Sequence, residues 1–580
     1  MMNSYGVFRG VMGLEGHIMS NFSFLLGQDD YEQFAIPCVE AEKAFSISPT
    51  MCAMATRKAF ELAVKWVYAA DRSIQMPYRD NLQSLIHEPT FERAIGNQKM
   101  LDSFQYIVKA GNITVHGKTR ISPKDAMFDL KLLFVFIQWI DYSYGRWYEK
   151  RAFDPKQVPC VQQALSRKEV QAKEDAAKQE LAKELSAKTE RIQELERQLE
   201  ESRAALSVQK APRPPMPDSE MDISEYETRQ RFIDLDLRLA GWDVDSEAEV
   251  VKERKVTGME DHEGQVGYVD YYLKGRDGKP LAIIEAKRTS YDPKKGLEQS
   301  RQYAKCLERE FGYRPLIFLS NGYATEFVDD ENGPSRPVGG VFSQDDLQRI
   351  MNRRREAIDP RTVPVNEKVA GRYYQIEAIK AFCDNLWKGK RRGLLVMATG
   401  TGKTRVSAAL TDVLMRARLV KNVLFLADRV ELVKQAKSAY GEYYPDWSLC
   451  NLCDNKHDVD ARVVFSTYQT MIGAIDTETA SDGKPAFSPG HFDLIIVDEA
   501  HRSIFKKYKD IFDHFDALVV GLTATPRDEV DRNTYDFFQA EHGVPTYLYE
   551  YKTAVERDHY LVPFYNIEAK TKFTDEGITY

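Results

Sequence analysis

The sequence lacks the features of membrane and secreted proteins. Its 580 residues contain no apolar run near the roughly 20 residues that a membrane-spanning helix requires. The N-terminus also lacks the charged, apolar and small-residue order of a secretory signal. Cysteine is scarce, with only 7 scattered residues, which is too few for a disulfide framework. These absences predict a cytoplasmic protein that does not enter a membrane.

The sequence also has no excess of basic residues over acidic ones. The chain has 80 Lys and Arg against 88 Asp and Glu, a formal net charge of −8. This balance excludes a generally basic coat for nucleic acid but not a locally basic groove. Hydrophobic residues make up 43% of the chain, which is enough to build several cores. At about 150 residues per domain, the length predicts three or four domains.

The composition and the spacing of apolar residues change three times along the sequence. These changes predict a multidomain α/β protein in four parts. Residues 1–155 have apolar residues at three- and four-residue intervals, which predicts a helical domain. Residues 156–217 carry leucines on a seven-residue repeat and then a proline-rich stretch, which predicts a long helix or coiled-coil spacer and a linker. Residues 218–365 mix helical and β patterns. Residues 366–580 alternate short apolar strands with helices, which predicts a parallel sheet.

A phosphate-binding loop is the most distinct motif of the last part. The segment Met397-Ala-Thr-Gly-Thr-Gly-Lys-Thr follows an apolar strand and precedes a helix, although Met397 replaces the first glycine of the usual pattern. Glycines let backbone amides curl around a phosphate, and the helix N-terminus adds partial positive charge. We expect Lys403 to hold the β- and γ-phosphates of ATP and Thr404 to ligate Mg²⁺. The remaining loop residues expected at the ATP site are Thr399, Gly400, Thr401 and Gly402.

Further candidates for the nucleotide site lie on either side of this loop. Asp498 and Glu499 close the apolar strand that begins at Asp493. Asp498 is placed to hold Mg²⁺, and Glu499 to orient or activate the attacking water. Upstream of the loop, the spacing would let Gln375 contact adenine. The hydroxyls expected to couple the nucleotide state to the rest of the protein follow the next strand: Thr523 and Thr525.

A second group of charged residues lies earlier in the chain. Glu285 and Lys287 lie two residues apart on a predicted strand and so share one face, while Asp270 is at a separation that places it on the preceding strand. One Asp, one Glu and one Lys are the minimum set for metal-assisted phosphodiester cleavage, in which the carboxylates hold Mg²⁺ and the lysine orients water or stabilises the developing charge. A salt bridge on the strand surface would give the same short pattern.

The ordered motifs of the last part resemble those of superfamily 2 helicases and translocases. The matching segments are MATGTGKT, FLADRVELVKQA, FSTYQT, VDEAH and LTATP. The resemblance implies a RecA-like domain and ATP-driven motion on DNA, with Arg429, Thr467 and Gln469 contacting the DNA strand. Such motors need a second RecA-like domain, whereas this sequence stops at Tyr580, soon after the first. We therefore expect a longer natural chain.

The earlier group resembles the PD-(D/E)xK nuclease domain of the R subunit of type I restriction–modification enzymes. A helix with an acidic residue precedes it, and a Q-x-x-x-Y motif, Gln299 to Tyr303, follows it. The resemblance implies that Gln299 and Tyr303 support DNA handling near the cut site. It also implies that Asp270 and Glu285 are metal ligands. The catalytic residues that it implies are Asp270, Glu285, Lys287 and Glu227.

The N-terminal part resembles helical domains found ahead of type I restriction nucleases, which are related to HEPN folds. The matching segment is Ala110–His116. Catalytic HEPN ribonucleases pair an arginine with such a histidine, but Val108 and Lys109 stand where the arginine is expected. We therefore interpret residues 1–155 as an adapter.

Taken together, the resemblances imply the N-terminal part of an R subunit that uses ATP and Mg²⁺. It would translocate double-stranded DNA and cut it when translocation stalls, with separate methylation and specificity subunits as partners. Two alternatives remain open at this stage. One is a helicase–nuclease of DNA repair, which neighbouring methylase and specificity genes would exclude. The other is a non-catalytic binding module, which an absence of metal at Asp270 and Glu285 would favour.

Overall fold

The computed structural model describes most of the chain outside the predicted spacer. The described residues are 20–77, 82–116, 121–145, 147–159, 216, 225–259, 266–286, 296–322, 324–454, 460–476, 487–500, 509–526, 528–529 and 532–563. The predicted coiled coil lies outside these ranges. Within them, no helix is both long enough and apolar enough to cross a membrane.

The N-terminal part is a bundle of helices around an aromatic core. Its helices are α1 Glu32–Ala44, α2 Pro49–Ala70, α3 Leu82–Ile86, α4 Pro89–Ile95, α5 Gln98–His116 and α6 Pro123–Tyr144. Ser48 and Ser122 accept hydrogen bonds from the first turns of α2 and α6, and a proline follows each cap. These two long helices confirm the predicted helical periodicity. The core is built on rings from α2, α5 and α6 that contact one another: Phe60, Phe104 and Phe136.

The central part is a mixed six-stranded sheet. Its strands follow chain order across the sheet: β1 Val250–Thr257, β2 Val266–Lys274, β3 Pro280–Ala286, β4 Leu316–Ser320, β5 Thr325–Val328 and β6 Arg336–Val338. Only β3 and β4 pair in parallel, and α9 (Leu297–Phe311) connects them across one face. On the other face, α8 (Glu225–Leu239) and α10 (Gln344–Glu356) share a core with the strands. The segment Glu331–Gly340, whose prolines and glycines are typical of a connector between domains, contains β6, because Arg336 and Val338 pair with β5.

The last part is a seven-stranded sheet in which every pairing is parallel. Its order is β15-β7-β12-β11-β8-β10-β9. The strands are β7 Arg392–Met397, β8 Val423–Ala427, β9 Leu449–Asn451, β10 Val463–Thr467, β11 Leu494–Asp498, β12 Leu518–Thr523 and β15 Tyr547–Tyr549. Helices α11 Tyr373–Trp387, α12 Lys403–Arg416 and α13 Val430–Tyr443 cover one face, and α14 Tyr468–Asp476 and α16 Lys509–His514 cover the other. The expected short apolar runs form β7, β8, β10, β11 and β12, and two short edge strands that the sequence did not reveal, β9 and β15, flank them.

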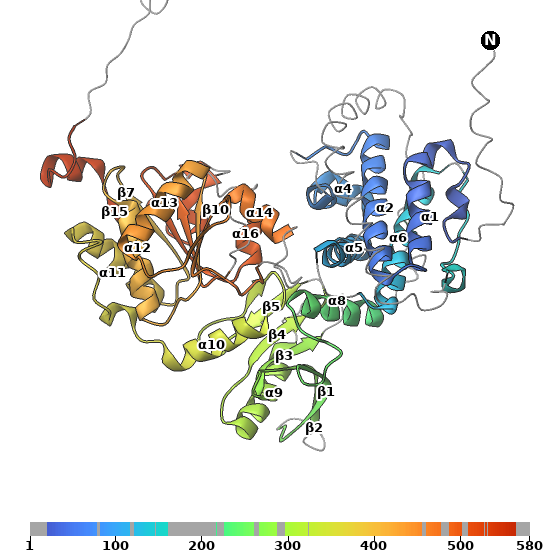
Figure 1. Ribbon diagram of the computed structural model, residues 1–580, viewed down its shortest axis with the longest axis horizontal. Helices are drawn as coiled ribbons and strands as arrows, with labels where there is room; N and C mark the ends of the chain where they lie inside the picture. The colour runs from blue at the N-terminus through green and yellow to red at the C-terminus, as the bar shows by residue number, and fades with distance from the viewer. Residues whose placement is uncertain are drawn as a thin grey trace, which may run out of the picture.

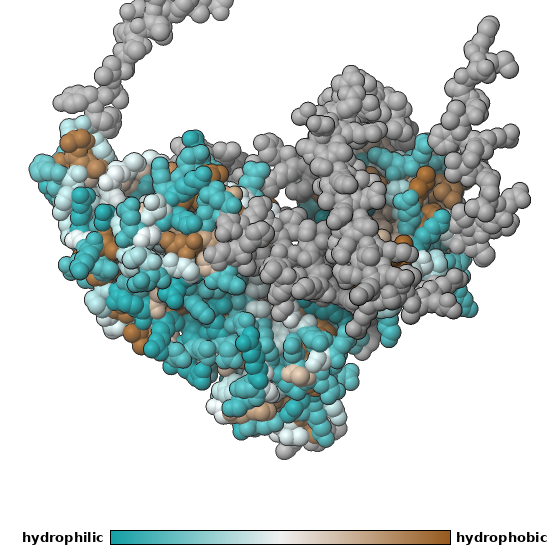
Figure 2. Space-filling view, in the orientation of Figure 1, coloured by the Kyte–Doolittle hydropathy of each residue, from teal (hydrophilic) through white to brown (hydrophobic). Residues whose placement is uncertain are grey.

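The mixed sheet lies between the helical part and the parallel sheet, and a helix joins it to each neighbour (Figure 1). Helix α8 buries Phe232 in the core of the helical part and Ile233 in the core of the mixed sheet. Lys109 of α5 donates to Asp236 of α8 at 2.6 Å. Lys109 therefore helps to dock the helical part on α8. Figure 2 shows mainly hydrophilic side chains over the described surface of this face, with apolar ones in small separate spots.

Candidate nucleotide and nuclease sites

The predicted phosphate-binding loop connects the carboxyl end of β7 to the first turn of α12. Gly400 and Gly402 have φ values of +87° and +89°, a left-handed conformation that favours glycine. Behind the loop, the Gln375 side-chain amide donates to the carbonyl oxygen of Thr401 at 2.9 Å, and the Tyr374 hydroxyl donates to the same oxygen at 3.0 Å. Helix α11 thus holds the loop in place. Tyr374 was not predicted from the sequence, where only its position beside Gln375 could have indicated this role.

The lysine of the loop meets the acidic end of β11. The Lys403 ammonium lies 2.9 Å from Glu499 Oε1, although β12 separates β7 from β11 in the sheet. Glu499 has a φ of +51°, a backbone strain that is frequent at functional sites. Burial raises the pKa of Asp498 to about 6, even though Lys403 opposes the shift. Asp498 and the Thr404 hydroxyl are the hard oxygen donors that Mg²⁺ prefers.

Four other predicted residues end or follow strands at this same edge of the parallel sheet, but they differ in exposure. Arg429 follows β8, Gln469 follows β10, and both are exposed. Thr467 and Thr523 are buried. Their hydroxyls accept local backbone N–H groups, from Thr470 in the first case and from Thr525 in the second, each at 3.2 Å. Arg429 and Gln469 are thus available to an external ligand, whereas Thr467 and Thr523 shape the turns beside it.

The two predicted metal-binding carboxylates lie on neighbouring strands of the mixed sheet. Tyr271 pairs with Ile284 in the antiparallel ladder of β2 and β3, so the next position places Asp270 opposite Glu285. Residues directly opposite in such a ladder share one face. Asp270 Oδ2 accepts a hydrogen bond of 2.7 Å from the backbone N–H of Ala286, and Glu285 is only 4% exposed. The structure therefore brings the two carboxylates together.

The Q-x-x-x-Y residues lie over this pair. Gln299 donates to the Tyr303 hydroxyl at 2.6 Å, from one turn of α9 to the next. Tyr303 shares a core with Tyr272 and Ile283, which lie on the same faces of β2 and β3 as the two carboxylates. Burial raises the pKa of Tyr303, although the hydrogen bond with Gln299 opposes the shift. Tyr303, Gln299 and the two carboxylates form one cluster. Lys287 lies outside the described residues, as does the side chain of Glu227, whose backbone is in α8.

The two carboxylates of this cluster suit a Mg²⁺ ion that is also coordinated by substrate. Among the residues that the structure describes, no three His, Cys, Asp or Glu side chains gather to hold a metal. Mg²⁺ commonly takes one or two carboxylates and completes its shell with water and substrate phosphates. Asp270 and Glu285 supply that number.

Gly267 should be essential for the position of Tyr303. A Cβ atom at this residue would lie 2.4 Å from Tyr303 Cε1, so a Gly267→Ala variant must displace the ring. We expect a loss of about 1–3 kcal/mol in the free energy of unfolding, measured by chemical denaturation. The control is Gly473→Ala in α14, where a Cβ would meet nothing within 4 Å and alanine favours the helix. Equal stability of both variants would contradict the packing described here.

Comparison with known proteins finds two family models side by side on this chain. The model described as "Type I restriction enzyme R protein N terminus" matches residues 249–336. The model described as "Type III restriction enzyme, res subunit" matches residues 368–528. The EcoKI endonuclease subunit of type I restriction enzymes from Escherichia coli K12 is 26% identical across 96% of this chain. The chain is thus similar, over nearly its whole length, to an endonuclease subunit of a type I restriction enzyme.

Another endonuclease subunit and a solved fragment are also similar to this chain. The EcoAI endonuclease subunit from Escherichia coli is 30% identical over 51% of this chain. The present chain covers 37% of the EcoAI subunit and 56% of the EcoKI subunit, so it spans about half the length of these relatives or less. A solved fragment of a putative HsdR subunit from Vibrio vulnificus YJ016 is 25% identical. The match covers 56% of this chain and 59% of the Vibrio fragment, with a TM-score of 0.25.

The two matched regions of the chain coincide with its two candidate sites. Asp270, Glu285 and Tyr303 fall within the region that resembles the R protein N terminus. Lys403 and Asp498 fall within the region that resembles the res subunit. Helix α10 lies between the two matches.

Proposed function

We propose that this chain is the nuclease and first motor half of a type I restriction R subunit that hydrolyses ATP, translocates double-stranded DNA and cleaves it. In this proposal, residues 1–155 are the adapter and 156–217 the spacer. Residues 218–365 form a PD-(D/E)xK nuclease domain, and residues 366–580 form the first RecA-like domain. The supporting observation is that one chain holds two sites in separate sheets: Lys403 beside Glu499 in one, and Asp270 beside Glu285 in the other.

At the nucleotide site, the loop amides and Lys403 would bind the phosphates of ATP. Thr404 and Asp498 would hold Mg²⁺, which when bound neutralises part of the phosphate charge. Glu499 is 28% exposed and contacts Lys403, so it is within reach of a water molecule near the terminal phosphate. We assign it the role of orienting or activating that water. Gln375 would contact adenine.

At the nuclease site, Asp270 and Glu285 would hold Mg²⁺, which when bound lowers the pKa of a coordinated water. The hydrogen bond from Ala286 fixes the orientation of the Asp270 carboxylate. Lys287 would orient the attacking water or stabilise the charge that develops on the phosphate. Glu227 is a fourth candidate. Tyr303 and Gln299 would keep the DNA backbone aligned with the carboxylates.

The proposed partners are double-stranded DNA and the methylation and specificity subunits of the same complex, in the cytoplasm. Arg429 and Gln469, exposed beside the nucleotide site, are the candidate DNA contacts from the motor half. The EcoAI and EcoKI relatives are type I restriction endonuclease subunits, which favours this assignment over a repair helicase–nuclease without methylase partners.

The test is plasmid cleavage by the full-length subunit reconstituted with its methylation and specificity subunits. We expect linearisation of an unmethylated plasmid only when ATP and Mg²⁺ are both present. The nucleotide site needs both of them, and the nuclease site needs Mg²⁺. Chelation of Mg²⁺, or replacement of ATP by a non-hydrolysable analogue, should abolish cleavage. Cleavage that persists with the analogue would refute the role assigned to the motor half, and a complex without any cleavage would favour the binding-module alternative.

A further inference from the structure

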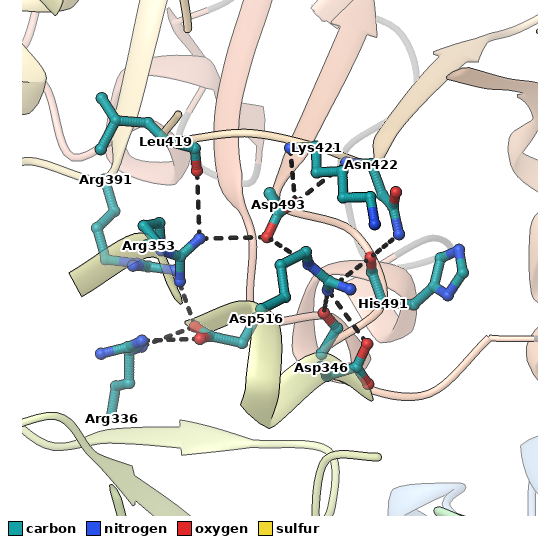
Figure 3. A network of polar contacts seen from close by, with 12 residues as sticks. Arg336, Asp346, Arg353, Arg391, Leu419, Lys421, Asn422, His491, Asp493 and Asp516 are labelled. Carbon is teal, nitrogen blue, oxygen red and sulfur yellow. Dashed lines mark hydrogen bonds and ion pairs between the residues drawn. The ribbon is translucent and has the colours of Figure 1, made fainter. Parts of the chain in front are cut away.

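A network of arginine–carboxylate contacts joins the mixed sheet to the parallel sheet (Figure 3). Arg336 of β6 makes two hydrogen bonds of 2.7 Å to the carboxylate of Asp516. Arg349 and Arg353 of α10 donate to Oδ1 of Asp493, at 3.2 and 3.1 Å. Both aspartates are less than 10% exposed. A bidentate pair and a shared carboxylate in a buried setting fix direction as well as distance.

The backbones of the two halves also approach closely at this interface. A Cβ atom at Gly339, just after β6, would lie 2.8 Å from the backbone of His514 in α16. A Cβ at Gly490, before β11, would lie 2.9 Å from the Phe342 ring and 3.0 Å from Asp346. Glycine is needed at both positions for the halves to meet. The network is therefore part of a packed interface rather than a set of surface ion pairs.

Each aspartate also has partners within its own half. Asp516 accepts from Arg391, which precedes β7, at 2.9 Å. Asp493 Oδ2 accepts from the backbone N–H groups of Lys421 and Asn422, at 2.9 and 3.1 Å. Burial alone would raise the pKa of Asp516, but Arg391 and Arg336 outweigh it and lower the pKa to about 2. Loss of the arginines of the mixed sheet would thus leave both aspartates with partners.

The position of these aspartates relates the interface to the nucleotide site. Asp493 immediately precedes β11, which ends at Asp498, and Asp516 lies just before β12, which ends at Thr523. Strands of this length span about 17 Å. The two strands therefore contact the nuclease half at one end and carry the candidate ATP-site residues at the other.

Resting on the function proposed above, we infer that Arg336, Arg349 and Arg353 are positioning residues that dock the nuclease sheet on the amino ends of β11 and β12. The nuclease then moves as one body with the strands that carry Asp498 and Thr523. DNA cleavage depends on this docking, whereas ATP hydrolysis does not. The three arginines contact neither the carboxylate pair nor the phosphate loop, so they act through the relative placement of the two sites.

The test compares an Arg336→Gln, Arg349→Gln, Arg353→Gln triple variant with wild type in the full reconstituted complex. We expect DNA-dependent ATPase within about twofold of wild type and a loss of cleavage of at least about tenfold, because the aspartates keep their own partners while the docking contacts are lost. Hydrogen exchange should accelerate at least about tenfold in β6 and α10 but stay slow in β2 and β3, which shows undocking without unfolding of the nuclease. The control is Arg276→Gln, which removes an exposed pair with Asp345 and should change none of these values.

If the triple variant does not fold, a double variant that retains Arg349 takes its place: Arg336→Gln, Arg353→Gln. Its expected loss of cleavage is smaller, about threefold or more. Cleavage within about twofold of wild type in the folded variant, or unchanged exchange in α10, would overturn the inference. A parallel loss of ATPase and cleavage would also overturn it. Failure of the proposed function would be recognised separately, because wild type itself would then lack ATPase or cleavage.

Discussion

DNA-stimulated ATP hydrolysis by the full-length subunit should fall by at least about a hundredfold in a Lys403→Ala variant. The reason is the position of Lys403, which is the first residue of α12 and whose ammonium lies 2.9 Å from Glu499. Without it, a charge-assisted contact to the phosphates is lost. The measurement is phosphate release by the reconstituted complex with and without target DNA.

The matched control for this variant is Lys380→Ala. Lys380 is exposed on α11, the helix that holds the loop from behind, but it belongs to no predicted site. The Lys380→Ala variant should hydrolyse ATP at the wild-type rate, and both variants should assemble with the partner subunits. Hydrolysis at the wild-type rate in Lys403→Ala would show that ATP is not bound at this loop.

Plasmid cleavage should fall by at least about a hundredfold in Asp270→Asn and in Lys287→Ala, because metal binding and electrostatic stabilisation each contribute several kcal/mol to the transition state. Asparagine keeps an oxygen that can accept the hydrogen bond from Ala286, so the first variant removes the charge and spares the β2–β3 contact. Linearisation of an unmethylated plasmid with ATP and Mg²⁺ measures the effect.

The control for the cleavage assay is Asp277→Asn. Asp277 is exposed in the turn between the same two strands and accepts only a local backbone hydrogen bond from Lys279. Its cleavage rate should match wild type. Cleavage near the wild-type rate in both Asp270→Asn and Lys287→Ala would mean that these residues form an ordinary surface salt bridge.

The sequence predicted much of the parallel sheet because its strands are short apolar runs bounded by polar turns. The strands that precede Lys403, Asp498 and Thr523 are where the apolar pattern placed them. The alternation of strands and helices also brings these residues to one edge, since all parallel strands end on the same side of a sheet. The pairing of Asp270 with Glu285 followed from the same kind of local pattern.

The contacts between the parts could not be predicted in this way. The run Arg353-Arg-Arg is typical of a solvated helix end, yet Arg353 and Arg354 pair with carboxylates from two different sheets. Helix α8 looks like an ordinary amphipathic helix, but its two faces enter two different cores. Such contacts depend on tertiary proximity between distant segments, which leaves no periodic trace in the sequence.

We propose that ATP hydrolysis and DNA cleavage take place at two separate sites of one chain. The most direct measurement is of both rates, on the same reconstituted complex, for Lys403→Ala and for Asp270→Asn. We predict that Lys403→Ala loses hydrolysis and cleavage together, because cleavage follows translocation, and that Asp270→Asn loses cleavage while its DNA-dependent ATPase stays within about twofold of wild type. An Asp270→Asn complex that lost ATPase in step with cleavage would contradict the claim.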